Sequence, residues 1–153
     1  MGAAGAAWVR AALLAGVVVA ADQVTKRMVE SDIELGHGRD GVAFLDLVHV
    51  RNNGVAFGLL SGGGTALVVA LTLGALVAVL IWFAREPARP LAWVPTGLLV
   101  GGALGNLIDR VRQGSVTDFL KIPHWPAFNL ADAAITVGVV TLVIALETRH
   151  SRT

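Results

Sequence analysis

Apolar residues fill four long stretches of the chain, and polar residues gather between them. A helix that crosses a bilayer needs roughly 20 predominantly apolar residues, with a range of about 17–25. The pattern therefore predicts four membrane spans, at residues 6–21, 65–84, 91–108 and 129–146. The first span is shortened by Arg10, whose side chain we expect to reach one membrane interface. We interpret residues 1–153 as a single membrane domain.

Two larger polar segments separate the spans, at residues 22–64 and 109–128. The residues of the first segment that suit a strand are Leu45, Leu47, Val48 and Val50, ahead of the turn signal Asn-Asn-Gly. The second segment contains Trp125 between two prolines, which is typical of a loop at headgroup level. The predicted fold is a mainly α membrane protein with four transmembrane helices. A small β-rich extracytoplasmic segment is expected between helices one and two, resting at the membrane surface.

The distribution of lysine and arginine bears on the orientation of the chain. An even number of spans places both termini on one side, and the short connector near residues 85–90 lies on that side too. The larger polar segments hold more basic residues, whereas the short terminal and connecting segments hold them at higher density. Short loops weigh more in the positive-inside rule, so we favour cytoplasmic termini.

The composition fits a membrane protein. The chain is 55% apolar and 15% charged, with a mean hydropathy of +0.70, and a soluble domain of this size could not hide so much apolar surface. It has no cysteine, which excludes disulfides and thiol nucleophiles. The four histidines share no ligand spacing, so neither a metal nor another cofactor is predicted. A net charge of +1 without a basic block gives no sign of nucleic-acid binding.

Two carboxylates need an explanation, because Asp132 begins the last span and Asp118 lies shortly before it. An ionised carboxylate inside a membrane costs about 2.5–3.5 kcal/mol on insertion scales. One interpretation is local: Asn129 caps the helix and places Asp132 at its third position, where the helix dipole favours an acid. The other interpretation is that the loop returns and brings the acids together. They would then share a proton and could hydrolyse a peptide bond without a metal or a thiol.

Other polar residues are expected on the same side of the membrane. Asn106 and Arg110 are four apart and therefore share a helix face. Asn52 and Gly54 lie in the turn sequence of the first polar segment. Asn106 could equally make an interhelical hydrogen bond, and Arg110 could anchor a helix end at the interface. Contact with a substrate and these structural roles both stay open from the residues alone.

Asp22 and Lys26 also stand four apart, at the end of the first predicted span. This is the spacing of an ion pair on a helix. We therefore favour a salt bridge at the helix end over a catalytic role for these two residues.

Four blocks of sequence carry a resemblance to a known family. They are DQVTK (Asp22–Lys26), NNGVAFG (Asn52–Gly58), GNLIDRVRQGSVTDFL (Gly105–Leu120) and FNLADAAI (Phe128–Ile135). In this order and spacing they resemble lipoprotein signal peptidase, or signal peptidase II, an intramembrane aspartyl protease family. The resemblance covers nearly the whole chain.

The resemblance implies a multi-pass protease of the bacterial inner membrane, with cytoplasmic termini and a site near the extracytoplasmic surface. Its substrate would be a prolipoprotein, cleaved just before a cysteine that carries diacylglycerol. The implied partners are this substrate and membrane lipid, with no nucleic acid, and we expect a monomer. The glycine-rich third span could leave room for the substrate's own helix.

The resemblance also assigns roles to individual residues. Asp118 and Asp132 would be the catalytic dyad. The positions that would contact the substrate, or the antibiotic globomycin, are Asn52, Gly54, Asn106, Arg110 and Asn129. The positions that would support the structure are Asp22, Lys26 and Asp109.

Two rival functions remain to be weighed. A small ion-coupled carrier could use the two acids as a cation or proton site. Against it, the acids lie near one face instead of the midplane, and the sequence shows no internal repeat. A structural or assembly subunit would use the acids only for capping and pairing, and replacing either acid by asparagine would then be silent.

Overall fold

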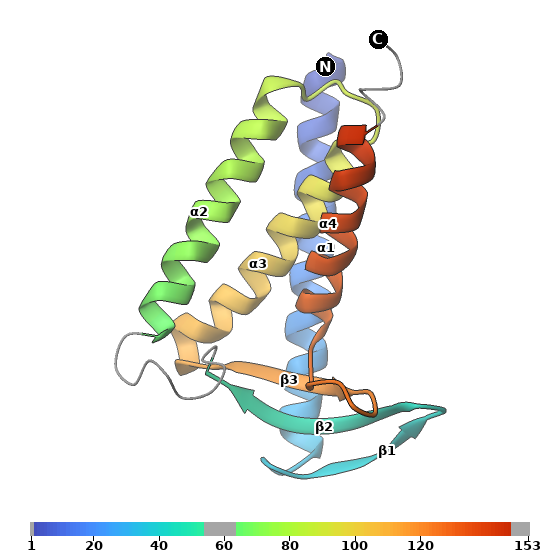
Figure 1. Ribbon diagram of the computed structural model, residues 1–153, viewed down its shortest axis with the longest axis vertical. Coiled ribbons are helices and arrows are strands. Elements are labelled where there is room, and N and C mark those ends of the chain that lie inside the picture. The colour runs from blue at the N-terminus through green and yellow to red at the C-terminus, as the bar shows by residue number, and fades with distance from the viewer. Residues whose placement is uncertain (1, 54–63, 148–153) are drawn as a thin grey trace.

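The computed structural model describes residues 2–53 and 64–147 as helices that run alongside one another, with a small sheet across one end (Figure 1). In chain order the elements are α1 (Ala3–Asp32), β1 (Gly38–Val42), β2 (Leu45–Asn52), α2 (Gly64–Arg85), α3 (Trp93–Gln113), β3 (Val116–Lys121) and α4 (Leu130–Glu147). The start of α1 and the end of α4 lie together, at the end away from the sheet. This arrangement agrees with an even number of crossings.

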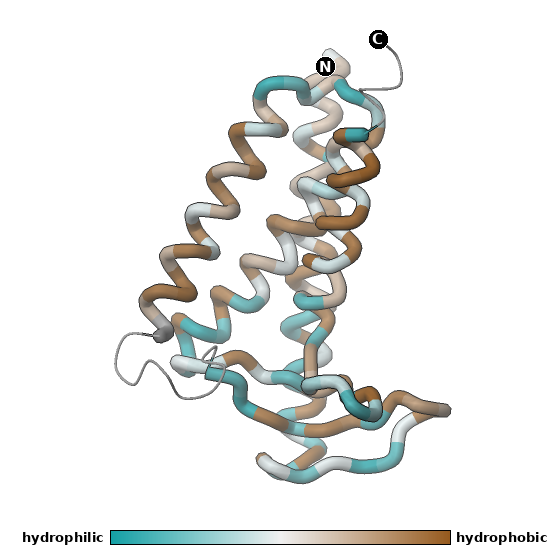
Figure 2. The backbone as a smooth tube through the Cα atoms, in the orientation of Figure 1, coloured by the Kyte–Doolittle hydropathy of each residue, from teal (hydrophilic) through white to brown (hydrophobic). Residues whose placement is uncertain are grey.

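Within the described residues, α1, α2 and α4 are long and apolar enough to cross a membrane. The protein is therefore a multi-pass membrane protein. The third predicted span, residues 91–108, corresponds to α3, which has 21 residues but ends in a polar turn that contains Asp109, Arg110 and Arg112. Figure 2 shows the contrast: apolar residues predominate along α2 and α4, whereas polar residues gather at the sheet end of α3, and the strands carry residues of both kinds.

The first helix continues well beyond its predicted end. The sequence suggested a polar segment from residue 22, but α1 runs on to Asp32. Its polar residues Asp22 and Lys26 are almost completely buried, because they face α3. Val29 and Ile33, further along, pack with Phe119 of β3 and so fix the sheet to the end of α1.

The glycines of α3 serve close helix packing. A Cβ added at Gly101 would lie 2.7 Å from the Cβ of Val18 in α1, and one at Gly102 would lie 2.5 Å from the carbonyl oxygen of Ala131 in α4. Contacts this short leave no space for a side chain. The prediction that this glycine-rich helix leaves room for a substrate helix was therefore wrong, since α1 and α4 occupy that space.

The sheet is antiparallel, in the order β1-β2-β3. β1 and β2 confirm the β-rich segment expected between the first two helices. β3 lies in the second polar segment, where the sequence suggested only a loop. Its pairing places Thr117 opposite Arg51 and Asp118 opposite Val50, which brings one of the two candidate acids into the sheet.

Candidate active site

The N-terminus of α4 is capped by a reciprocal pair of hydrogen bonds. The Asn129 side-chain oxygen accepts from the backbone N–H of Asp132 at 2.9 Å. The Asp132 carboxylate accepts in return from the backbone N–H of Asn129 at 3.2 Å. This is the geometry of a capping box, with Asp132 at the third helical position. The interpretation that Asn129 caps α4 and that Asp132 is an acid of its first turn is therefore correct.

Asp118 reaches the same place from β3. It is 2% exposed. The side-chain amide of Asn129 donates to its Oδ1 at 2.7 Å, and the side-chain amide of Asn52 in β2 donates to its Oδ2 at 2.9 Å. Burial raises the pKa of Asp118 to about 6, and the nearby charge of Asp132 adds to that rise. The hydrogen bonds from Asn52 and Asn129 and the charge of Lys26 act in the opposite direction on this pKa.

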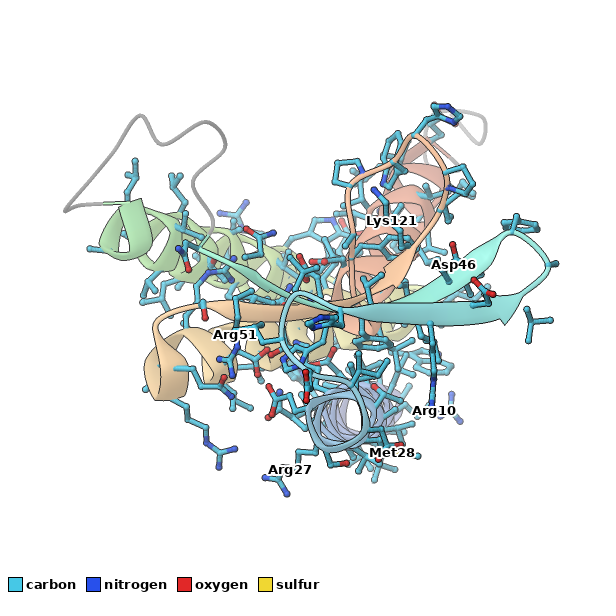
Figure 3. All side chains as sticks on the ribbon, turned by 90° about the horizontal axis from the view of Figure 1, so that it is seen from below. Arg10, Arg27, Met28, Asp46, Arg51 and Lys121 are labelled. Carbon is cyan, nitrogen blue, oxygen red and sulfur yellow. The ribbon has the colours of Figure 1, made fainter. Side chains whose placement is uncertain are left out.

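One amide network joins the two acids. Asn129 contacts both: its side chain donates to Asp118 and its backbone N–H donates to Asp132. Asn106 of α3 donates to Asp132 at 2.7 Å and accepts from the Asn129 side chain at 3.1 Å. Capping and pairing are thus not alternatives, because Asn129 does both. Seen from the sheet end, the strands cross over the helices between α1 on one side and α4 on the other (Figure 3).

Arg110 lies one helical turn beyond Asn106 and borders this network. Its guanidinium donates to the backbone oxygen of Asn106 at 3.4 Å, and its charge interacts with those of Asp132 and Asp118. Its Nε is buried without a hydrogen-bond partner within the described part of the chain. Such an unsatisfied donor is uncommon in a folded protein. Gly54, the remaining predicted contact residue, lies outside the described residues.

A buried charge cluster lies against the network. The ammonium group of Lys26 contacts Asp22 and Asp109, each at 2.8 Å. The predicted salt bridge between Asp22 and Lys26 is confirmed, and Asp109 completes it from α3. Asp22 also accepts a hydrogen bond from the backbone N–H of Ala131 at 3.0 Å, so the cluster holds the first turn of α4.

Sequence reasoning missed some residues of this region. Gln23 donates to Asp109 at 2.8 Å. The Thr117 hydroxyl, fully buried beside Asp118, donates to Glu30 of α1 at 2.6 Å. Gln23 stands inside the DQVTK block, so that block was the available signal. No local pattern marks Thr117 or Glu30, because their contact depends on how β3 packs against α1.

A pocket of about 510 Å³ opens beside Asp132. Its lining is mostly apolar and comes from the β3–α4 connection and the exposed face of α4: Ile122, Pro123, Trp125, Phe128, Asp132, Ala133, Thr136 and Val137. Trp125, at its rim, is 62% exposed. In the described ranges no cluster of three acidic, histidine or cysteine side chains is arranged to hold a metal ion.

Comparisons with known proteins show which family the chain resembles. The family model described as signal peptidase (SPase) II matches residues 14–148. A lipoprotein signal peptidase of Syntrophotalea carbinolica is 45% identical over 87% of this chain and 88% of its own length. One from Moorella thermoacetica is 42% identical, over 85% and 87% respectively.

A solved structure points the same way. It is described as a bacterial membrane enzyme obtained by the in meso method, and it superposes with a TM-score of 0.84 at 35% identity. The match covers 94% of this chain and 90% of that one. The carrier function gains no support from any of these matches. With the family model spanning most of its length, and with relatives of this similarity, the chain belongs to the signal peptidase II family.

Proposed function

We propose that this protein is an aspartic endopeptidase that removes the signal peptide from prolipoproteins, with Asp118 and Asp132 as its catalytic dyad. The relatives named lipoprotein signal peptidase support the reaction. The observation that carries the assignment of the dyad is Asn129, which hydrogen-bonds both acids at once. It ties two carboxylates from separate elements into one network beside an open pocket.

The dyad works by exchanging protons with water and the substrate. The ionised acid takes a proton from a water molecule as the water oxygen attacks the scissile carbonyl carbon. The protonated acid gives its proton to the carbonyl oxygen. The two acids then exchange roles, and the acid that took the proton from water gives it to the leaving nitrogen. With its pKa raised to about 6, Asp118 gains or loses a proton close to neutral pH.

The surrounding polar groups orient the dyad and the substrate. Asn52, Asn106 and Asn129 donate to the carboxylates and hold them in place. The buried Nε of Arg110 is a donor for a carbonyl group of the bound substrate, which would satisfy it. Gly54 stays a predicted contact, on the strength of the resemblance alone.

The pocket beside Asp132 is where an apolar part of the substrate would enter. Its volume of about 510 Å³ is within the range of ligand sites, roughly 300–1,000 Å³. Trp125 at its rim suits the membrane–water interface. The substrate in this proposal is a prolipoprotein with diacylglycerol on its cysteine, cleaved just before that cysteine. The location is the bacterial inner membrane, with cytoplasmic termini, the site near the extracytoplasmic surface, and a monomeric chain.

The test is cleavage in liposomes. The purified protein is incubated with a diacylglyceryl-modified prolipoprotein, beside Asp118→Asn and Asp132→Asn variants that are shown to be folded. Cleavage by the wild type and a loss of at least about 1,000-fold in both variants is the expected result, since removal of a catalytic group typically costs this much. Normal cleavage by both variants would show that the acids are structural. A wild type that cleaves no such substrate would refute the proposed reaction.

A further inference from the structure

Lys26 has a contact that a purely structural ion pair does not need. Its ammonium group carries three N–H donors and no acceptor. Two of its contacts go to Asp22 and Asp109. The third goes to the side-chain oxygen of Asn106 at 3.1 Å. The lysine is 2% exposed, so water does not compete for these contacts.

The contact with Lys26 decides which way the Asn106 amide faces. The oxygen of that amide accepts from two donors, Lys26 and the Asn129 side chain. Its NH₂ group is therefore left to donate to Asp132 at 2.7 Å. Rotating the amide by half a turn would set its NH₂ group against the ammonium and its oxygen against the carboxylate. Both new contacts would be repulsive, because like polar groups would face each other in a buried site.

We propose that Lys26 is a positioning residue for the dyad, because its ammonium fixes the Asn106 amide so that an N–H donor always faces Asp132. The inference rests on the proposed function, since it concerns the acids assigned to catalysis there. It goes beyond the expected role of Lys26 in supporting the structure. The chain of contacts runs from α1 through α3 to α4, from Lys26 to Asn106 to Asp132.

The electrostatic surroundings of Lys26 are consistent with this role. The charged groups that contact it are Asp22, from its own helix, and Asp109, from α3. Together the three residues carry a net charge of about −1, counting each side chain as ionised. The positive charge of Lys26 also acts on Asp118, whose pKa it lowers. The ammonium group is therefore coupled to both acids, to one through Asn106 and to the other through space.

A pair of double variants separates positioning from structural support. Lys26→Met with Asp109→Asn removes the donor to Asn106, whereas Lys26→Gln with Asp109→Asn keeps an N–H donor on a side chain of similar length. Each pair removes one positive and one negative charge, so the net charge of the cluster is unchanged. Both proteins are first compared by thermal unfolding. Their kcat and KM on the lipidated prolipoprotein are then measured.

We expect the two variants to differ in kcat. The methionine variant should lose about 100-fold in kcat at unchanged KM, the scale of a misplaced catalytic group. The glutamine variant should keep a kcat close to that of the wild type. Equal kcat values in two folded variants would overturn the proposal, whether both are high or both are low. If the methionine variant does not fold, Asn106→Ser decides, because a wild-type kcat without the amide would also overturn it.

The failure of the proposed function looks different from the failure of this inference. If the wild type does not cleave, or if Asp118→Asn and Asp132→Asn cleave normally, the dyad itself is wrong and Lys26 has nothing to position. If the wild type cleaves and the dyad variants do not, only the comparison of the methionine and glutamine variants bears on Lys26.

Discussion

Asn129 combines a structural task and a proposed catalytic task in one side chain. Its oxygen caps α4 and its NH₂ group holds Asp118, so the two functional ends of the amide serve different purposes. Serine caps helices about as well as asparagine but has no amide NH₂ group. A substitution can therefore remove one task and keep the other.

We expect Asn129→Ser to unfold at a higher temperature than Asn129→Ala, because the serine keeps the cap of α4. Its cleavage rate should fall at least tenfold, about the effect of losing a charge-assisted hydrogen bond of roughly 1.5–3 kcal/mol. Asn129→Ala should lose the cap as well, at a cost of about 1 kcal/mol. Thermal unfolding and cleavage are measured for both variants. Wild-type activity in the serine variant would show that the bond to Asp118 is dispensable.

The raised pKa of Asp118 predicts how stability depends on pH. Its folded-state pKa of about 6 lies above the ordinary value of 3.8. The folded protein therefore binds this proton more tightly than the unfolded chain does. The resulting stabilisation is complete below the ordinary pKa and is lost as the pH rises through about 6.

The measurement compares the wild type with Asp118→Asn, which cannot titrate at this position. Between about pH 6 and pH 4, the difference in unfolding temperature should move in favour of the wild type as the pH falls. A difference that stays constant over this range would show that the pKa of Asp118 is not raised.

At the residue scale, the sequence identified most of the candidate site. Asp118, Asp132, Asn52, Asn106 and Asn129 all converge, and the family resemblance had implied a site role for each of them. The hydrogen bond of Thr117 to Glu30 was out of reach, because the two residues are far apart in the chain and no local pattern marks either of them. Such contacts are decided by tertiary packing, which local patterns do not record.

At the scale of elements, the packing of α3 against α4 fixes the position of Asp132, one acid of the proposed dyad. α3 approaches α4 so closely that its Gly102 contacts the backbone of the first turn of α4. That turn carries Asp132. A side chain on this face of α3 would therefore displace an acid of the proposed dyad without touching it.

We predict that Gly102→Ala lowers both stability and cleavage, because its Cβ would lie 2.5 Å from the carbonyl oxygen of Ala131. The loss of stability should be about 1–3 kcal/mol, the usual cost of overpacking. Gly74→Ala in α2 is the matched control, since its Cβ meets nothing within 4 Å. That control should be neutral or slightly stabilising, because alanine favours a helix by about 0.5–1 kcal/mol over glycine. Equal behaviour of the two variants would contradict the close packing.

The elements themselves were predicted unevenly. The boundaries of α2 and α4 agree with their predicted spans to within a residue or so, because uninterrupted apolar runs define them. α1 was cut short in the prediction, since its buried ion cluster looks like a polar loop in the sequence. β3 was missed because Thr117 and Asp118 make the segment look polar in the sequence, although its first four residues are buried in the structure.

At the scale of the whole molecule, polar and apolar residues occupy different parts of the long axis. Apolar residues predominate along the helices, and polar residues gather where α1, α3 and α4 meet the sheet (Figure 2). The proposed dyad lies at this boundary, where the first turn of α4 meets β3. The single-domain organisation stays a prediction, and so does the monomeric state.

The length of α1 has a consequence for the bilayer around it. Its 30 residues extend about 45 Å at 1.5 Å per residue, whereas the hydrocarbon core is about 30 Å thick. α1 is thus longer than the hydrocarbon core is thick, and we expect its length to set the height of the proposed dyad relative to the bilayer. The cleavage rate in liposomes should pass through a maximum as the lipid acyl chains lengthen. In a thicker bilayer the proposed dyad would lie inside the hydrocarbon core, and in a thinner one it would lie too far above the diacylglycerol of the substrate. A cleavage rate that does not depend on acyl-chain length would show that the bilayer changes its thickness around the protein.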